Sequence, residues 1–128
     1  MGRLRPRPTD SELAILRILW DRGPSTVRQV HDVLAGTRET GYTTTLKLMQ
    51  IMADKGLVKR NESSRTHVYA AAASEAQTQR QLVKDLVDRA FGGSAAALVM
   101  QALDAESTSA DELREIRKLI DDYREKRQ

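Results

Sequence analysis

The stretch that decides the fold is Tyr42-Thr-Thr-Thr-Leu-Lys-Leu-Met-Gln-Ile-Met-Ala-Asp-Lys-Gly56. It is long enough for about four helical turns, and a closing glycine is typical of a helix C-terminus. With a step of about 100° per residue, one side collects a buried stripe of Tyr42, Thr45, Leu46, Met49, Met52 and Ala53. The other side presents Thr43, Thr44, Lys47, Ile51, Asp54 and Lys55. Short hydroxyl groups around one central cation, Lys47, make an unusual solvated face, which needs an explanation.

Two further helices are predicted before this stretch. Thr9 and Glu12 have the spacing of a capping box, and the apolar residues that follow recur at intervals of three and four until Gly23-Pro24 ends the run. A second, shorter helix is expected from Thr26 to about Leu34, with Ser25 as its N-cap. Residues 37–41 form a polar connector to the helix that begins at Tyr42. Two helices joined in this way to a third predict a helix-turn-helix.

A β-hairpin is expected directly after Gly56. Residues 57–60 and 66–69 are β-prone, and the loop between them, residues 61–65, consists of turn-forming and charged residues. A hairpin in this position gives the order of a winged helix, which ends near Ala73. We therefore expect a flexible basic arm at residues 1–8, a winged-helix DNA-binding domain at 9–73 and a helical dimerisation domain at 74–128.

The C-terminal part is predicted to hold three helices, one capped by Ser74, one opened by Ser94 and one capped by Ser109. Gly92-Gly93 breaks the first of them. Their apolar stripes would stay exposed in a single chain, and a second copy of the chain is the simplest cover. The interface residues expected are Leu82, Leu86, Phe91, Leu98, Leu103, Leu113, Ile116 and Leu119. The predicted fold class is mainly α with a small β-hairpin: a winged helix-turn-helix plus a C-terminal helical dimerisation domain.

Composition separates the two halves of the 128 residues and excludes several classes of protein. Residues 1–74 hold 12 Lys and Arg against 7 Asp and Glu, whereas residues 75–128 hold 9 against 11. A basic half joined to an acidic half suits a polyanion-binding domain carried by an assembly domain. The absence of cysteine excludes disulfides and thiolate metal sites, and no apolar run is long enough for membrane insertion. A cytoplasmic location is expected.

A DNA-binding role explains the open face of the helix at residues 42–55. In the major groove, Thr43, Thr44 and Lys47 would meet base edges, since threonine can touch a thymine methyl and lysine can meet guanine or phosphate. Ile51 lies on the same side but could equally pack under the hairpin. The alternative is an ordinary solvated helix, which periodicity alone leaves open.

Phosphate contacts are expected around this helix. The hairpin residues Lys59, Arg60 and Arg65 would neutralise backbone phosphates, unless they merely form a solvated turn. Ser25 and Thr26 open the second helix, where free N–H groups favour a phosphate oxygen, although capping alone also explains Ser25. Arg3, Arg5 and Arg7 of the arm could reach a minor groove.

No feature of the sequence indicates an enzyme or a cofactor. His31 and His67 are far apart and neither has metal-ligand spacing with a second histidine or a cysteine. There is no nucleophile elbow, P-loop, dinucleotide-binding turn or metalloprotease motif. We expect no catalytic residue, no metal site and no cofactor.

Five segments of the chain resemble the penicillinase-repressor family of bacterial transcriptional repressors, the BlaI/MecI type. They are Thr9-Asp-Ser-Glu-Leu-Ala-Ile-Leu-Arg-Ile-Leu-Trp20, Ser25-Thr-Val-Arg-Gln-Val30, Gly41-Tyr-Thr-Thr-Thr-Leu46, Asp54-Lys-Gly-Leu-Val58 and Phe91-Gly-Gly-Ser94. No single segment is decisive, but their order and spacing together are specific. The resemblance implies a homodimer that binds a palindromic operator through the helix 42–55 and the wing 59–66 and blocks transcription.

The resemblance also implies a partner, an inactivating protease of a membrane-sensor system that leads to cleavage in the dimerisation domain. In the family the cleaved bond is often an Asn-Phe pair after a Leu-Val pair. Here Leu98-Val99-Met100 is followed by Gln101-Ala102, which departs from that pattern. The cysteine motif of copper-responsive relatives is absent as well.

Two other functions stay open at the level of sequence. The same fold could serve a winged-helix regulator controlled by a small ligand in its C-terminal domain, although those helices show no obvious cluster of polar groups. It could also serve as a protein–protein adaptor, which the modest net charge of +3 permits. Binding to promoter fragments, strongest for a palindrome, would distinguish a DNA reader from an adaptor.

Overall fold

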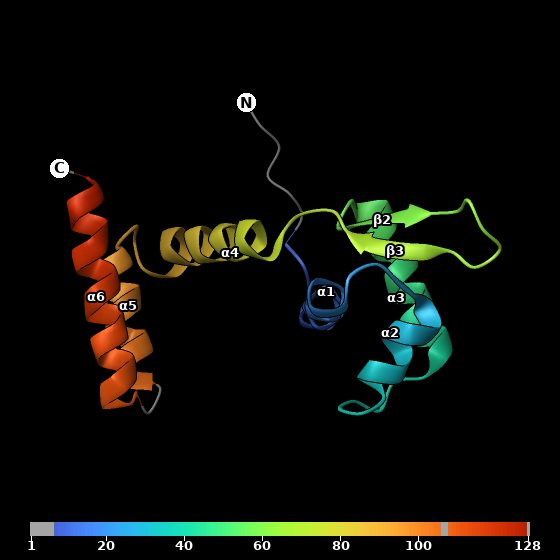
Figure 1. Cartoon of the computed structure of the whole chain (residues 1–128), viewed down its shortest axis with the longest axis horizontal. Coiled ribbons are helices and arrows are strands. Elements are labelled where there is room, and N and C mark those ends of the chain that lie inside the picture. The colour runs from blue at the N-terminus through green and yellow to red at the C-terminus, as the bar shows by residue number, and fades with distance from the viewer. Residues whose placement is uncertain (1–6, 106–107, 128) are drawn as a thin grey trace. The chain divides into compact units, whose positions relative to one another are not determined.

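The computed structural model describes residues 7–105 and 108–127, so the predicted arm residues Arg3 and Arg5 lie outside the described part. In chain order the elements are α1 (Asp10–Arg22), β1 (Ser25–Thr26), α2 (Val27–Leu34), α3 (Tyr42–Lys55), β2 (Val58–Asn61), β3 (Val68–Ala71), α4 (Glu75–Ala90), α5 (Ala95–Ala105) and α6 (Ala110–Lys126) (Figure 1). The predicted class, mainly α with a small β-hairpin, is confirmed.

Helix α1 begins as its sequence predicts. The Thr9 hydroxyl accepts the N–H of Glu12 at 3.2 Å, and the Glu12 carboxylate accepts the N–H of Thr9 at 2.9 Å. This reciprocal capping box satisfies two N–H groups that have no partner inside the helix. The helix ends at Gly23, whose N–H donates to the carbonyl of Leu19.

The predicted N-cap of α2 is wrong by one residue. Thr26, not Ser25, is the cap, because Gln29 lies three residues further on and completes a second capping box with it. Ser25 instead belongs to β1, and its hydroxyl donates to the carbonyl of Gly23 at 2.8 Å. Ser25 is therefore a buried strand residue.

The hairpin of the wing, β2 and β3, belongs to a three-stranded antiparallel sheet in the order β1-β3-β2. The sheet therefore has one strand more than the predicted hairpin. In the register, Ser25 faces Tyr69 across β1 and β3, and Arg60 faces the same Tyr69 across β2 and β3. The third strand ties the start of α2 to the hairpin.

One hydrophobic core holds α1, α2, α3 and the sheet together. It consists of Ile15, Leu16, Leu19, Val27, Val30, Leu34, Met49, Met52, Leu57, Val58 and Tyr69. Trp20 packs at its edge, and its indole N–H donates to the carbonyl of Ala73 at 3.0 Å, which fixes the chain at the exit of the wing against α1. The core and this hydrogen bond thus hold α1 and the end of the hairpin together in one domain.

The contacts divide the chain into two compact units, Met1–Leu82 and Val83–Gln128, with the boundary inside α4. The end of the wing and the start of α4 therefore belong to the first unit by contact. None of the described residues of α4, α5 and α6 is buried. Within the described ranges, no helix has the length and apolarity needed to cross a membrane.

Candidate nucleic-acid interface

Helix α3 presents an open polar face, as the sequence predicts. Thr43, Thr44 and Lys47 are exposed, and Ile51 beside them has 39% of its surface accessible. On the other side, Thr45, Met49 and Met52 are completely buried. The predicted readers therefore share one accessible face on a helix that its opposite side holds in the core.

The buried side of α3 is rotated relative to the predicted stripe. Its centre lies between Thr45 and Met49, about 50° from Tyr42 on the helical wheel. As a result Tyr42 stands at the edge of the core and is 39% exposed, and Gln50 enters the open face. Gln50 was missed because the wheel was centred on Tyr42. An amide at this position can pair with adenine in a major groove.

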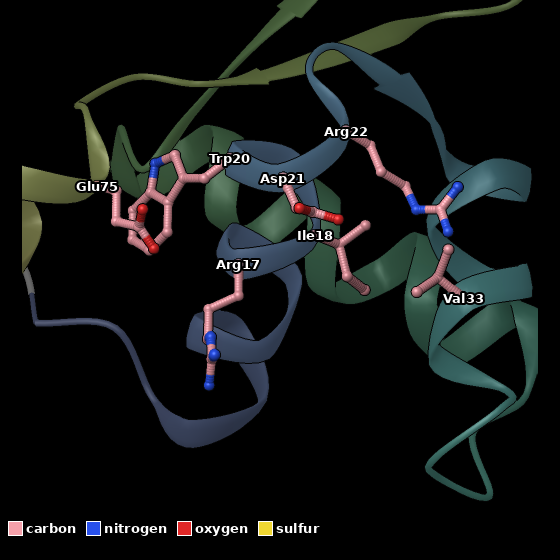
Figure 2. A pocket seen from close by; sticks show the side chains of 7 residues that line it. All are labelled: Arg17, Ile18, Trp20, Asp21, Arg22, Val33 and Glu75. Atoms are coloured by element: carbon pink, nitrogen blue, oxygen red, sulfur yellow. The ribbon is translucent and has the colours of Figure 1, made fainter. Parts of the chain in front are cut away.

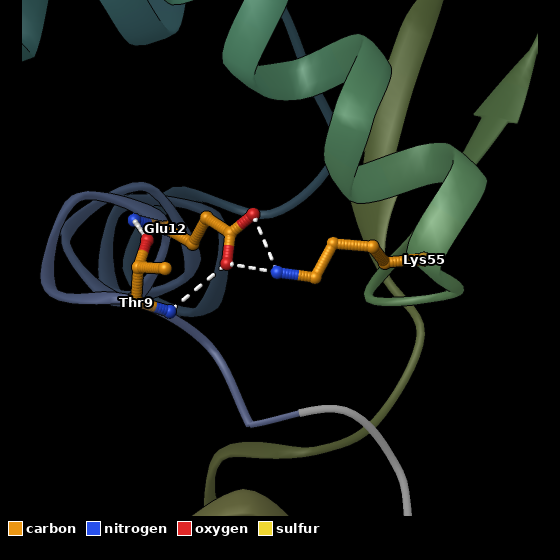
Figure 3. A network of polar contacts seen from close by, with 3 residues as sticks. All are labelled: Thr9, Glu12 and Lys55. Carbon is orange, nitrogen blue, oxygen red and sulfur yellow. Dashed lines mark hydrogen bonds and ion pairs between the residues drawn. The ribbon is translucent and has the colours of Figure 1, made fainter.

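Lys55 does not belong to the open face on which it was predicted. Its ammonium group contacts both carboxylate oxygens of Glu12, at 2.7 Å and 3.0 Å (Figure 3). Glu12 is buried at 2% exposure, and Lys55 keeps 30% of its side chain accessible. The pair joins the first turn of α1 to the last turn of α3, and so fixes the far end of the helix that carries the predicted readers.

Three interactions make Glu12 a stable anion. Burial of the carboxylate by itself would raise the pKa of Glu12, but hydrogen bonds from Lys55 and from the Thr9 N–H, with the positive charge of Lys55, outweigh burial. The pKa of Glu12 therefore lies below its ordinary value.

The beginning of α3 is held by side chains of α2. The Tyr42 ring meets the His31 ring edge-on, with 5.7 Å between centroids and 84° between planes, and the Arg28 guanidinium carbon lies 4.8 Å from the Tyr42 centroid. Below them, the buried Thr45 hydroxyl donates to the carbonyl of Gly41 and lies 3.5 Å from His31 Nδ1. Arg28 and His31 were not predicted as site residues, because only the folded chain brings α2 against Tyr42.

The two residues predicted to contact phosphate at the start of α2, Ser25 and Thr26, differ in how accessible they are. Ser25 is 5% exposed, and its hydroxyl is already bonded to Gly23, so this side chain does not reach the surface. Thr26 is partly exposed, but its hydroxyl and N–H both serve the capping box. In the described part of the chain, the N–H groups of Val27 and Arg28 are then the donors of the first turn left without a partner.

The wing carries its three predicted cations on the surface. Lys59, Arg60 and Arg65 are all exposed. Arg60 Nε lies 2.8 Å from a carboxylate oxygen of Glu62, and a hydrogen bond with the Tyr69 hydroxyl, followed by the charge of Glu62, raises the pKa of Arg60 above its ordinary value. Arg60 therefore has an anionic neighbour at the surface. The loop beyond it is shaped by the Ser63 N–H, which donates to Asn61, and by the Ser64 hydroxyl, which donates to the Thr66 carbonyl.

A separate depression of about 450 Å³ lies over α1. Trp20 and Glu75 line one end and Arg22 and Val33 the other, with Arg17, Ile18 and Asp21 between them (Figure 2). Its lining mixes both signs of charge and takes no residue from α3 or the hairpin. It is therefore not part of the face that holds the predicted readers.

The residues predicted for dimerisation are accessible in the single chain. Leu86, Leu113 and Leu119 are exposed, and the others, Leu82, Phe91, Leu98, Leu103 and Ile116, are partly buried. Val83, Val99, Met100, Ile120 and Tyr123 are further exposed apolar side chains of the same helices. Apolar surface on this scale is typical of a protein interface.

The chain matches the family described as "Penicillinase repressor" over residues 8–122. It is similar to a protein named "Transcriptional regulator BlaI" from Mycobacterium tuberculosis, with 36% identity over 108 residues that cover 82% of this chain and 78% of that protein.

Two solved structures share the fold of the first unit. One is the solution structure of the DNA-binding domain of the repressor BlaI, with 21% identity and a TM-score of 0.51 over 59% of this chain and 92% of that chain. The other is Bacillus licheniformis BlaI, a monomeric form in complex with the blaP half-operator, with 21% identity and a TM-score of 0.50 over the same shares. The likeness confirms the winged-helix arrangement predicted from the sequence.

Proposed function

Because the chain belongs to the penicillinase-repressor family, we propose that it acts as a homodimeric repressor of transcription, with the winged helix of each protomer on one half of a palindromic operator. The family consists of transcriptional repressors, so the prediction that the chain is not an enzyme is confirmed. In the proposal, Thr43, Thr44 and Lys47 of α3 meet base edges. Phosphates are met by Lys59, Arg60 and Arg65 and, at the helix start that Thr26 caps, by the N–H groups of Val27 and Arg28.

The observation that carries this proposal is the open face of α3. Its exposed hydroxyl groups, Lys47 and Gln50 can bond to base edges, whereas the buried side keeps the helix rigid. Lys59, Arg60 and Arg65 are exposed cations of the hairpin, which suits a contact that sets the register without reading sequence. A helix with such a face would fit the major groove, which admits one α-helix.

The dimer is supported by the uncovered apolar side chains of α4, α5 and α6. A second copy of the chain would remove them from water, at about 25 cal/mol for each Å² of apolar surface buried. Joining two readers also raises the effective concentration of the second half-site once the first is bound. The second unit would thus convert two weak contacts into one strong contact.

Proteolytic inactivation is not included in the proposed function. Gln101 and Ala102 lie inside α5, in place of the pair found in cleaved relatives, and both are exposed as helical residues. Control by the protease of a membrane-sensor system stays a prediction from the family resemblance.

The test is a selection of fragments from the source genome that bind the purified chain, followed by gel shift with the recovered sequence. We expect a palindrome, bound at least tenfold more tightly than either half-site alone, and a dimer in sedimentation. A protein–protein adaptor would enrich no sequence. A repressor that works as a monomer would bind the half-site and the palindrome with equal affinity per site, which would contradict the dimeric proposal.

A further inference from the structure

We propose that Arg28 of α2 is an additional phosphate contact of the DNA-binding face, and that the Tyr42 ring of α3 positions its guanidinium for that contact. The inference rests on the proposed function and adds to it a residue pair that the sequence pattern did not single out. The sequence predicts Tyr42 in the core. Because Tyr42 lies at the edge of the core instead, one face of its ring is accessible to Arg28.

The ring is fixed from two sides. Arg28 lies over its face at 4.8 Å from the centroid, and His31 meets it edge-on at 5.7 Å. A guanidinium stacked on an aromatic face keeps its N–H groups pointing outward in the plane, free to form a two-pronged contact with an oxyanion. Since Arg28 and Tyr42 are both exposed, those N–H groups are accessible to a partner from outside the chain.

Arg28 takes this position although an acidic neighbour is available. Asp32 lies four residues further along the same helix, a spacing at which an arginine and an aspartate commonly pair. Among the described residues, however, no carboxylate forms an ion pair with Arg28. Within the described residues the positive charge is therefore not neutralised by a carboxylate, and it is held over Tyr42.

The location suits a phosphate. Arg28 is in the first turn of α2 and Tyr42 is the first residue of α3, so the pair lies where the N-terminal ends of the two helices meet, next to Thr43 and Thr44. Helix N-termini carry partial positive charge and free N–H groups. A backbone phosphate beside the groove that receives Thr43 would lie against this pair.

The experiment measures binding to the selected operator as a function of salt for the wild type, Arg28→Ala, Tyr42→Phe, Tyr42→Leu and the double variant Arg28→Ala/Tyr42→Leu. Arg28→Ala should weaken binding roughly fivefold to tenfold and lower the slope of log K against log salt by about 0.9, the value for one phosphate. Tyr42→Phe keeps the ring and should bind as the wild type does.

Tyr42→Leu should weaken binding with the salt slope unchanged, because the charge remains but loses its orientation. In the Arg28→Ala background the same substitution should have no further effect, since it acts only through Arg28. Circular dichroism and thermal melting would establish that each variant is folded, and Arg28→Lys, which keeps the charge without the fork, should lose part of the affinity but keep the slope.

Arg17→Ala removes one exposed positive charge from α1 and is the matched control, expected to leave the slope unchanged. An unchanged slope for Arg28→Ala, an equal loss for Arg17→Ala, or an additive effect of Tyr42→Leu in the double variant would each overturn the inference. Failure of the proposed function is distinct, because then the wild type itself would select no sequence.

Discussion

Lys47 occupies the middle of the open face of α3, between the threonines at its start and Ile51 one turn further on. The side chain is exposed, so its removal costs little folding free energy and tests recognition alone. Lys47→Ala should weaken operator binding, with a salt slope lower by about 1 if the ammonium group touches phosphate, or with relaxed base preference if it reads guanine.

Binding isotherms at several salt concentrations, on the selected operator and on single-base variants of it, measure both quantities. Lys118→Ala, which removes an exposed lysine from α6, is the control and should change neither. Isotherms for Lys47→Ala that coincide with those of the wild type at every salt concentration would remove Lys47 from the recognition face.

The ion pair between Glu12 and Lys55 should make the free energy of unfolding decrease at acidic pH. The pKa of Glu12 is lowered in the folded chain from an ordinary value near 4.5, so the pair stabilises the fold fully above that value and progressively less as pH falls through the folded value. Glu12→Gln should lower the free energy of unfolding by about 1–3 kcal/mol at pH 7. The difference in free energy of unfolding between Glu12→Gln and the wild type should become smaller at acidic pH.

Urea unfolding at pH 7 and near pH 3 would measure this difference. Asp10→Asn is the matched control, because it removes an exposed carboxylate from the same turn of α1. If Glu12→Gln and the wild type differed by the same amount at both pH values, the ion pair would not be the source of the stability.

The two residues of this pair differ in how far sequence can predict them. The capping box of Thr9 and Glu12 is local, and its spacing alone revealed it. The contact with Lys55 joins residues 43 positions apart and depends on how α3 packs against α1. The local pattern therefore predicts the capping box, whereas the contact between Glu12 and Lys55 follows only from the packing of the folded chain.

At the scale of the element, Gly56 ends α3 in the left-handed conformation, with φ of 81°. A Cβ added there would meet nothing within 4 Å, so the cost of a substitution is backbone strain alone. Gly56→Ala should lower the free energy of unfolding by about 1–2 kcal/mol. Gly56→Asn should cost less, because asparagine tolerates this conformation.

Thermal unfolding of the two variants checks the order, and a melting temperature for Gly56→Ala equal to that of Gly56→Asn would contradict it. Gly23 provides a comparison inside the same unit, since it also has positive φ, of 83°, and no atom near an added Cβ. Operator binding of folded Gly56→Ala should be unchanged, because the glycine closes the helix far from Thr43.

The elements show which patterns suffice for prediction. Helices α1 and α3 were predicted within a residue, because caps and apolar spacing agree in them. Strand β1 was not, since a two-residue strand has no periodicity and exists only through its pairing with β3. The N-cap of α2 was misassigned between two residues that both favour that position, and Gln29 was the signal that distinguishes them.

At the scale of the whole molecule, the two units differ in how far their apolar side chains are shielded from water within one chain. Among its described residues the first has a core of eleven buried apolar side chains, whereas no described residue of α4, α5 or α6 is buried. Sequence could predict both the apolar stripes and the need for a cover. It could not predict which side chains touch across a dimer, because that depends on the packing of two copies.

Leu86→Asp tests this assembly in the intact chain. Leu86 is 49% exposed in the single chain, so an aspartate there should scarcely affect the fold of one protomer. In a dimer the same carboxylate would be removed from water without a partner, which is costly. We expect monomers in sedimentation, unchanged binding to a half-site, and loss of the roughly hundredfold advantage that linkage gives the palindrome. Lys84→Asp, which places a carboxylate at an exposed and already charged position of α4 with loss of the surface ion pair to Asp88, should remain dimeric. A Leu86→Asp dimer would show that another surface of the second unit holds the two readers.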